Sequence, residues 1–201
     1  MKTTIVAAVL LTGILAIQAQ ERLPREEALK YAFIVSANLK EMLKTPIPTD
    51  PDVKRPVAVR DGDYGGMVLP EAKLSAETLA KVGTEVVPIG QLWLHKLAPL
   101  SGGQVALPSK LHKVHVSAGD QEGDAVCCAL GVKKNADAGL ELLVFGKDKE
   151  PLARAPMKAI SATQENPIEM SSERQDDRGV VVLKLLGKYE ARFDVTDPEQ
   201  Y

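Results

Sequence analysis

The sequence predicts a mainly β protein, an antiparallel β-sandwich of the immunoglobulin-like (Ig-like) type with roughly eight strands and an N-terminal amphipathic helix. Three observations predict this class. Short apolar or alternating stretches are separated by turn residues, the chain holds 15 glycines and 13 prolines, and a helical period is clear only near the beginning. Because spacing does not fix strand order, a small β-barrel is the alternative architecture.

The first 19 residues have the pattern of a signal peptide. Lys2 is followed by an apolar stretch from Ile5 to Ile17 and by the small residue Ala19. This stretch is shorter than the about 20 residues that a membrane-spanning helix needs. We therefore expect cleavage after Ala19, export to the periplasm or the extracellular space, and no membrane span after cleavage.

The next segment, residues 20–45, predicts the amphipathic helix, with its helical turns between Arg25 and Lys44. Small and apolar residues recur there at steps of three and four and form one stripe, which must be buried. The stripe consists of Ala28, Leu29, Ala32, Phe33, Ser36, Leu39 and Leu43. Two alternatives remain open: the helix packs on the domain that follows, or it binds a protein partner or a second copy of the chain.

Residues 46–56 predict an extended linker, because prolines at positions 46, 48, 51 and 56 disfavour a helix. The expected organisation is a signal peptide (1–19), the helix (20–45), the proline-rich linker (46–56) and a β-sandwich domain (57–201). Within the last part, one short helix is expected between Ser75 as its cap and Gly83 as its stop.

The β-sandwich domain contains the strand patterns. The clearest is residues 188–195, where apolar and charged side chains alternate, as in a strand with one wet face. It follows the apolar stretch 180–186 and a turn at Gly187-Lys188, which predicts a hairpin. Further strands are expected at 90–97, 110–118, 124–132, 140–146 and 151–160, and as a pair within 55–69 joined at Asp61-Gly62.

The charge balance excludes one class of partner. The formal net charge is −2, with both signs interspersed along the chain. A nucleic-acid partner would require a basic face for its phosphates. We therefore expect no nucleic-acid binding.

The stretch RDGDYGGMVLP, residues 60–70, supplies the first candidate binding residues. Asp61 and Asp63 offer oxygen ligands to a cation, the glycines let a ligand approach closely, and Tyr64 would form an apolar wall. The competing interpretation is a hairpin turn at Asp-Gly with a bulge at Gly65-Gly66. The further ligands of an EF-hand calcium loop are missing.

The three histidines do not predict a metal site. In the strand 110–118, His112 and His115 point to opposite faces, so they cannot bind one ion together. His95 shares a face with Trp93 and is a candidate binding residue at the edge of the core. Zinc, phosphate-loop, dinucleotide-binding and GxSxG motifs are absent from the sequence. We expect no metal and no cofactor.

The two cysteines, Cys127 and Cys128, are adjacent in a predicted strand. They therefore point to opposite faces, and their Cα atoms are too close for an unstrained disulfide. Cys128 is expected in the core with Val126 and Leu130. Cys127 has only small neighbours on its face, so either another element packs there or its thiol is accessible and able to cross-link two chains.

These observations favour an exported, non-enzymatic module with a binding, accessory or structural role and an unidentified ligand. The candidate binding residues are Asp61, Asp63, Tyr64, His95 and Cys127. One alternative is an exported enzyme whose site, around His95, His112 and Asp61 or Asp63, assembles only in three dimensions. The other is a thiol- or metal-handling protein that uses Cys127.

Overall fold

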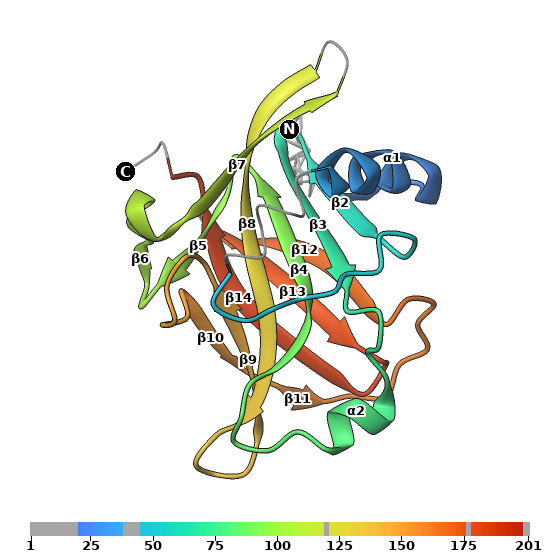
Figure 1. The fold of residues 1–201 in the computed structure, drawn as a ribbon, viewed down its shortest axis with the longest axis vertical. Coiled ribbons are helices and arrows are strands. Elements are labelled where there is room, and N and C mark those ends of the chain that lie inside the picture. The colour runs from blue at the N-terminus through green and yellow to red at the C-terminus, as the bar shows by residue number, and fades with distance from the viewer. Residues whose placement is uncertain (1–19, 38–44, 119–120, 176–177, 199–201) are drawn as a thin grey trace, which may run out of the picture.

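The computed structural model describes residues 20–37, 45–118, 121–175 and 178–198. Within these ranges the chain forms fourteen strands, two α-helices and one short 3₁₀-helix (Figure 1). All strand pairs are antiparallel, so the predicted mainly β, antiparallel class is confirmed. The strands outnumber the expected eight because several have only two to four residues.

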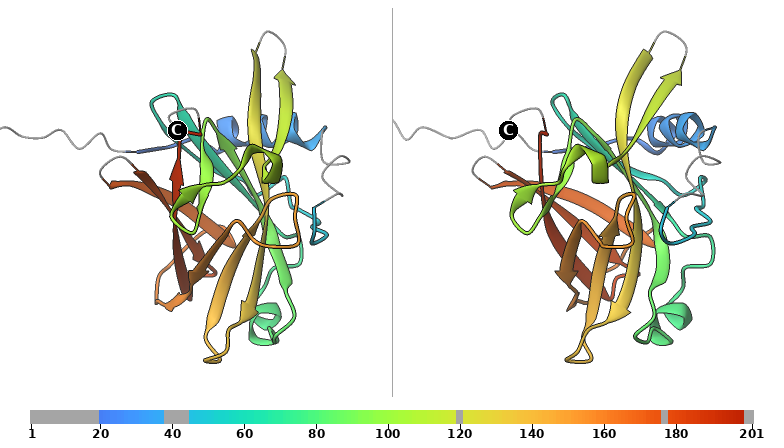
Figure 2. Two further views of the ribbon diagram at one scale, coloured as in Figure 1. Left: turned by 90° about the vertical axis from the view of Figure 1, so that its left-hand side faces the viewer. Right: turned by 60° about the vertical axis from the view of Figure 1, so that its left-hand side comes forward.

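The first sheet has eight strands in the order β1-β2-β3-β4-β8-β9-β10, with β7 also pairing with β8. These strands are β1 (Glu21–Arg22), β2 (Val57–Asp61), β3 (Tyr64–Pro70), β4 (Val87–His95), β7 (His112–Ala118), β8 (Gln121–Lys134), β9 (Leu140–Phe145) and β10 (Ala153–Pro156). β8 is the longest strand: its first part pairs with β7, its second part with β9, and its middle with β4. The pair β7–β8 projects beyond the rest of the sheet (Figures 1 and 2).

The second sheet has the order β12-β13-β14-β5-β6, with β11 also pairing with β14. Its strands are β5 (Ala98–Ser101), β6 (Gln104–Val105), β11 (Lys158–Ala159), β12 (Ile168–Gln175), β13 (Arg178–Leu185) and β14 (Tyr189–Thr196). The 3₁₀-helix η2 (Pro108–Lys110) connects β6 to β7 in the sequence. Along β14, Ala191, Phe193 and Val195 are buried, which confirms the predicted alternation. On the opposite, solvent-exposed face of β14, Arg192 forms an ion pair with Glu173 of β12.

The two sheets face each other across the main core (Figure 2). Leu92 and Leu130 from the first sheet belong to the same buried cluster as Leu183 and Phe193 from the second. β10 contacts β14, and β12 contacts β2 and β3, so the first sheet curls around the second at both edges. The Ig-like strand order is not confirmed, because β1 to β4 are consecutive neighbours, whereas Ig sheets have the orders ABED and CFG.

The outer face of the first sheet is also buried, as the alternative in which another element packs over Cys127 predicts. A second cluster joins residues of α1 (Arg25–Ser36) to Met67, Trp93 and Cys127 on the sheet. Trp93 Nε1 donates to Gln91 Oε1 at 3.2 Å, so the buried indole N–H is paired within this layer. The chain therefore has three layers: α1 with its neighbouring segment, the first sheet, and the second sheet (Figure 2).

Helix α1 packs on the sheet, as the first of the two alternatives predicts. Ala28, Ala32 and Val35 are buried against the sheet. Phe33, expected in the same stripe, is 67% exposed, because one residue is about 100° of rotation and places it beside the stripe defined by Ala32. α1 ends at Ser36, and the expected continuation lies partly in residues 38–44, outside the described residues. No helix in the described ranges has the length and apolar character to cross a bilayer.

The proline-rich segment lies along the same outer face. Ile47 packs against Ala129, Leu143 and Phe145, which form a third buried cluster. The Asp52 N–H donates to the Pro70 carbonyl at 2.8 Å. The segment therefore covers a part of the sheet, around β8 and β9, that α1 does not reach.

The turns differ slightly from those expected. Asp61 pairs with Tyr64, so the turn is Gly62-Asp63, with Gly62 at φ 59°. The pairing of β2 with β3 continues regularly through Gly65 and Gly66 without a bulge. A Cβ atom on Gly66 would lie 2.4 Å from Met170 Cε, so this glycine allows β12 to pack closely on β3.

The second hairpin also changes: Leu185 pairs with Tyr189, which leaves a three-residue loop in place of the expected Gly187-Lys188 turn. Leu186 and Gly187 both have positive φ in this loop. The short helix α2 (Ala76–Ala80) does begin after Ser75, whose hydroxyl accepts from the Thr78 N–H at 3.2 Å. The predicted cap is confirmed, but the helix ends at Ala80, before the predicted stop at Gly83.

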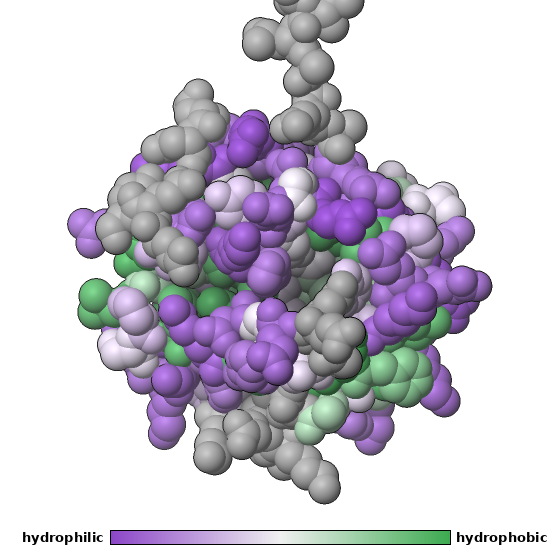
Figure 3. Space-filling view, turned by 90° about the horizontal axis from the view of Figure 1, so that it is seen from above, coloured by the Kyte–Doolittle hydropathy of each residue, from purple (hydrophilic) through white to green (hydrophobic). Residues whose placement is uncertain are grey.

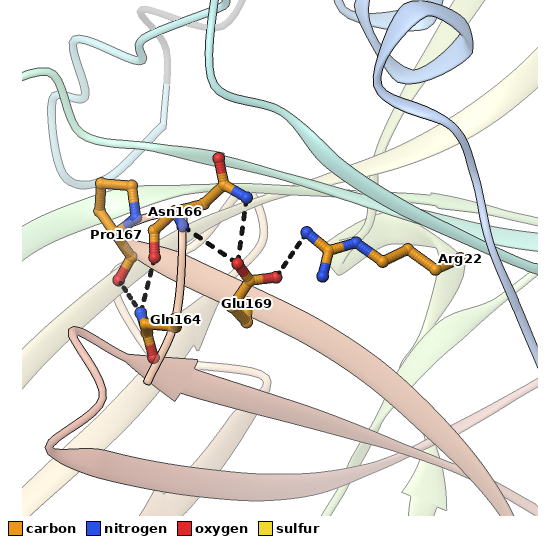
Figure 4. Close-up of polar contacts among 5 residues, drawn as sticks. All are labelled: Arg22, Gln164, Asn166, Pro167 and Glu169. Atoms are coloured by element: carbon orange, nitrogen blue, oxygen red, sulfur yellow. Dashed lines mark hydrogen bonds and ion pairs between the residues drawn. The ribbon is translucent and has the colours of Figure 1, made fainter. Parts of the chain in front are cut away.

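Polar contacts close the seam between β1 and β12 (Figure 4). A guanidinium nitrogen of Arg22 lies 2.8 Å from Glu169 Oε2. Glu169 Oε1 accepts two hydrogen bonds from Asn166, at 3.0 Å from its backbone N–H and 3.0 Å from its amide. Gln20 Oε1 accepts from the Ser172 N–H. The N-terminal segment thus joins the first sheet to the second.

The packing of α1 predicts unequal effects of one charge at two adjacent positions. Ala32→Glu should lower the free energy of unfolding by about 3 kcal/mol, because it buries a carboxylate without a partner. Phe33→Glu should change it by less than about 0.5 kcal/mol, because that side chain faces solvent. Urea denaturation followed by circular dichroism measures both values, and equal losses would contradict the observed orientation of the helix.

Candidate ligand-binding groove

A groove of about 490 Å³ lies on the outer face of the first sheet, between α1 and the projecting β7–β8 pair. α1 crosses the sheet and contacts β2 and β7, which leaves the ends of β2, β3, β4 and β8 beyond it uncovered. Figure 3 looks down on this end of the molecule, where hydrophilic residues predominate and hydrophobic residues show between them. The groove is in the size range of small-molecule sites, about 300 to 1,000 Å³.

The floor of the groove consists of small residues: Ala58, Gly65, Gly123 and Ala125. They come from three strands but share the outer face, because side chains alternate along each strand. A Cβ atom on Gly65 would have its nearest neighbour at 3.7 Å, and one on Gly123 at 3.5 Å, from His95 Cε1. Both distances are ordinary contacts, so the floor is open above these glycines.

The walls are apolar. α1 contributes Tyr31, Ile34 and Val35, and the sheet contributes Met67 and Val116. Trp93 lies at the inner end, 3% exposed. An apolar body with one flat side fits such a surface, because small floor residues allow close approach and the walls supply apolar contact.

The rim is polar. Guanidinium nitrogens of Arg60 lie 3.1 Å from Glu21 Oε2 and 3.7 Å from Glu27 Oε1, and hydrogen bonding to Glu21 raises the Arg60 pKa. Lys96 Nζ lies 3.6 Å from Asp63 Oδ2. These pairs link β1, α1 and β2 on one side of the groove, and the β2–β3 turn to the end of β4 on the other.

Tyr64 lies where the groove meets a second depression between the sheets. Its hydroxyl donates to Asp197 Oδ2 at 3.0 Å, and this hydrogen bond raises the Tyr64 pKa. The second depression is lined by Asp61, Tyr64, Lys96, Arg174 and Asp197, among others. Asp63 lines both hollows, whereas Asp61 lines the second depression and lies outside the groove.

The structure brings together three of the five predicted binding residues. Asp63, Tyr64 and His95 line the groove. Asp61 lies beside the groove, and Cys127 is buried in the cluster under α1. His95 Nδ1 is 3.4 Å from the Asp124 carbonyl oxygen. Among the described residues, no group of three or more histidine, cysteine, aspartate or glutamate side chains is arranged to hold a metal ion.

The other two histidines lie on opposite faces of β7, as predicted. His115 Nδ1 is 3.0 Å from Asp124 Oδ1 at the exposed side of the hairpin. His112 is the cross-strand neighbour of Cys127 on the face that α1 covers. The enzyme alternative had placed His95, His112 and Asp61 or Asp63 in one site; His95 and Asp63 line the groove, whereas His112 and Asp61 do not.

The cysteines point to opposite layers, as predicted, and both are completely buried. Cys128 lies between the two sheets and Cys127 in the cluster under α1. The accessible-thiol alternative for Cys127 is therefore wrong, because α1 packs over that face. Burial raises the pKa of the Cys127 thiol well above its ordinary value and raises that of Cys128 to about 12. A thiolate-based function has no support in this geometry.

Sequence reasoning missed most of the groove. Tyr31, Ile34 and Val35 lie within the predicted helix but outside its predicted apolar stripe, and Val116 was assigned only to a strand. The signal that could have indicated the site is the pair Gly123 and Ala125, small residues at alternate positions of one strand. Their significance depends on an element above them, which a strand pattern does not reveal.

A comparison of the chain with protein-family models, with curated proteins and with solved structures finds no match.

The buried thiols predict a loss of stability at high pH. The unfolded chain releases these protons near the ordinary pKa of 9.0, whereas folded Cys128 retains its proton up to about pH 12. The folded state therefore binds more protons in this window, and the free energy of unfolding falls as the pH rises, by up to about 1.4 kcal/mol per pH unit and thiol.

Urea denaturation between pH 8 and pH 11 measures this slope. The double variant Cys127→Ala, Cys128→Ala should show a smaller slope than the parent protein, whatever its absolute stability. A thiol-specific reagent should modify neither cysteine in the folded protein and both in denaturant. Rapid modification of Cys127 in the folded state would contradict its burial.

Proposed function

We propose that this protein is an exported, non-enzymatic binding module that holds a small, largely apolar organic molecule in the groove between α1 and the β7–β8 pair. The observation that carries the proposal is the floor of the groove. Ala58, Gly65, Gly123 and Ala125 leave an open apolar surface on a sheet face that is otherwise covered by α1 and residues 45–56. Covering such a floor with an apolar body removes it from water and so lowers the free energy of the complex.

The arrangement of the polar groups supports binding over catalysis. They lie at the rim, and those that form pairs do so with structural partners: Arg60 with Glu21, and Tyr64 with Asp197. Apolar walls with a few polar groups at the entrance are typical of ligand pockets. The export part of the proposal has its support in the sequence pattern of residues 1–19.

Filling the groove tests the proposal. Naphthylmethanol, a neutral aromatic probe, should bind and change the fluorescence of Trp93, the single tryptophan, which lies at the groove. Gly123→Leu should weaken this binding at least about tenfold, because the new side chain occupies the floor while its Cβ fits at 3.5 Å from His95. Calorimetric and fluorescence titration measure the affinity.

Gly83→Leu is the matched control. Gly83 follows α2, has no atom within 4 Å of an added Cβ, and lies away from the groove lining. This variant should bind naphthylmethanol as the parent protein does. Parent-like binding by a folded Gly123→Leu protein, or no binding by the parent, would contradict the proposed function.

A further inference from the structure

A polar side chain, His95, rises from the outer end of the groove floor. It is the last residue of β4 and shares the outer face with Trp93, because side chains alternate along a strand. Its cross-strand neighbours are Gly65 on β3 and Ala125 on β8. A Cβ atom on Gly65 would lie 3.8 Å from His95 Cβ, and one on Gly123 would lie 3.5 Å from His95 Cε1. The exposed imidazole therefore stands among residues with almost no side chain, which leaves it accessible from the groove.

The contact of His95 with β8 indicates which ring nitrogen carries the proton. β8 continues past the end of β4 here, and His95 Nδ1 lies 3.4 Å from the Asp124 carbonyl oxygen. A carbonyl oxygen can only accept, so Nδ1 is the donor, and in the neutral imidazole Nε2 is then an acceptor. Within the part of the chain that the structure describes, no hydrogen bond reaches Nε2. The groove thus contains an acceptor that the protein itself does not use.

The other polar side chains that the sheet contributes to the groove have protein partners. The Trp93 indole N–H donates to Gln91, and the Tyr64 hydroxyl donates to Asp197. The charged groups of the rim are held in the ion pairs described above, so an anion finds no free cation among them. A ligand without a donor would cover His95 Nε2 and leave it unpaired, which costs free energy once water is excluded.

From these contacts we infer that the ligand is a neutral, flat, apolar molecule with a hydroxyl or N–H group, such as an aromatic alcohol or an indole, whose donor binds Nε2 of His95. The inference rests on the proposed function, because it assigns the ligand class of the same groove. The apolar body lies on the small floor residues against Met67 and Trp93, and the donor lies at the outer end. His95 is then a specificity-determining residue, since a site that accepts a donor discriminates against analogues that lack it.

Two probes that differ in a single donor test the inference. Naphthylmethanol has a hydroxyl group, whereas its methyl ether keeps the naphthalene body and the oxygen but has no hydrogen to donate. The full chain should bind the alcohol about fivefold more tightly than the ether, because a net hydrogen bond to a neutral acceptor gives a ratio of this size. Trp93 fluorescence and calorimetric titration measure both affinities.

Variants of His95 identify the partner of the donor. His95→Phe keeps a ring but removes the acceptor, so the two probes should bind within about twofold of each other. His95→Gln supplies an amide oxygen and should restore part of the preference for the alcohol. His115→Phe is the matched control, because it replaces an exposed histidine on the opposite face of the β7–β8 pair, and it should leave the preference unchanged.

The outcomes distinguish the two proposals. Equal binding of alcohol and ether by the parent protein, or a preference that His95→Phe leaves intact, overturns the assigned ligand class while the groove remains a binding site. Binding of neither probe by the parent protein overturns the proposed function and the ligand class together. The ratio of two affinities is measured within one folded protein, so a change of stability in a variant does not alter it.

Discussion

The organisation of this protein depends on burial of both faces of one central strand. From Val126 to Val132, every residue of β8 is buried. One face packs between the two sheets and the other lies under α1 and the proline-rich segment. A strand of this kind is apolar at every position and cannot have a wet side. The helix and the segment 45–56 are therefore required parts of the fold, because without them half of β8 would be exposed to water.

The groove follows from the same arrangement. α1 contacts β2 and β7 but leaves the strand ends beyond it open. If those ends carried large apolar side chains, the uncovered area would be an exposed apolar patch that favours aggregation. Glycine and alanine occupy four of these positions, and their small side chains leave a groove in place of a raised apolar patch. The site is thus the part of a buried face that its cover does not reach.

Much of the β architecture was predictable because it depends on local patterns. The alternation in β14, the cap at Ser75 and the opposite orientation of Cys127 and Cys128 all follow from the period of two residues or from one side chain. The covering of Cys127 was not predictable, since periodicity tells which face a residue occupies but not which element packs there. The same limit explains why Asp63 and His95 were identified while Tyr31 and Gly123 were missed. Asp61 was placed in the same site as Asp63, but only Asp63 reaches the groove, because the turn at Gly62-Asp63 directs Asp61 to the second depression.

The seam at Gln20 and Arg22 has a consequence for how the chain reaches this structure. Gln20 bonds to Ser172 across 152 positions of sequence, and Tyr64 bonds to Asp197 across 133. The entropy of closing such long loops is lost before the contact repays it. During synthesis Gln20 emerges from the ribosome long before Ser172, so β1 stays unpaired on one side until β12 has been made.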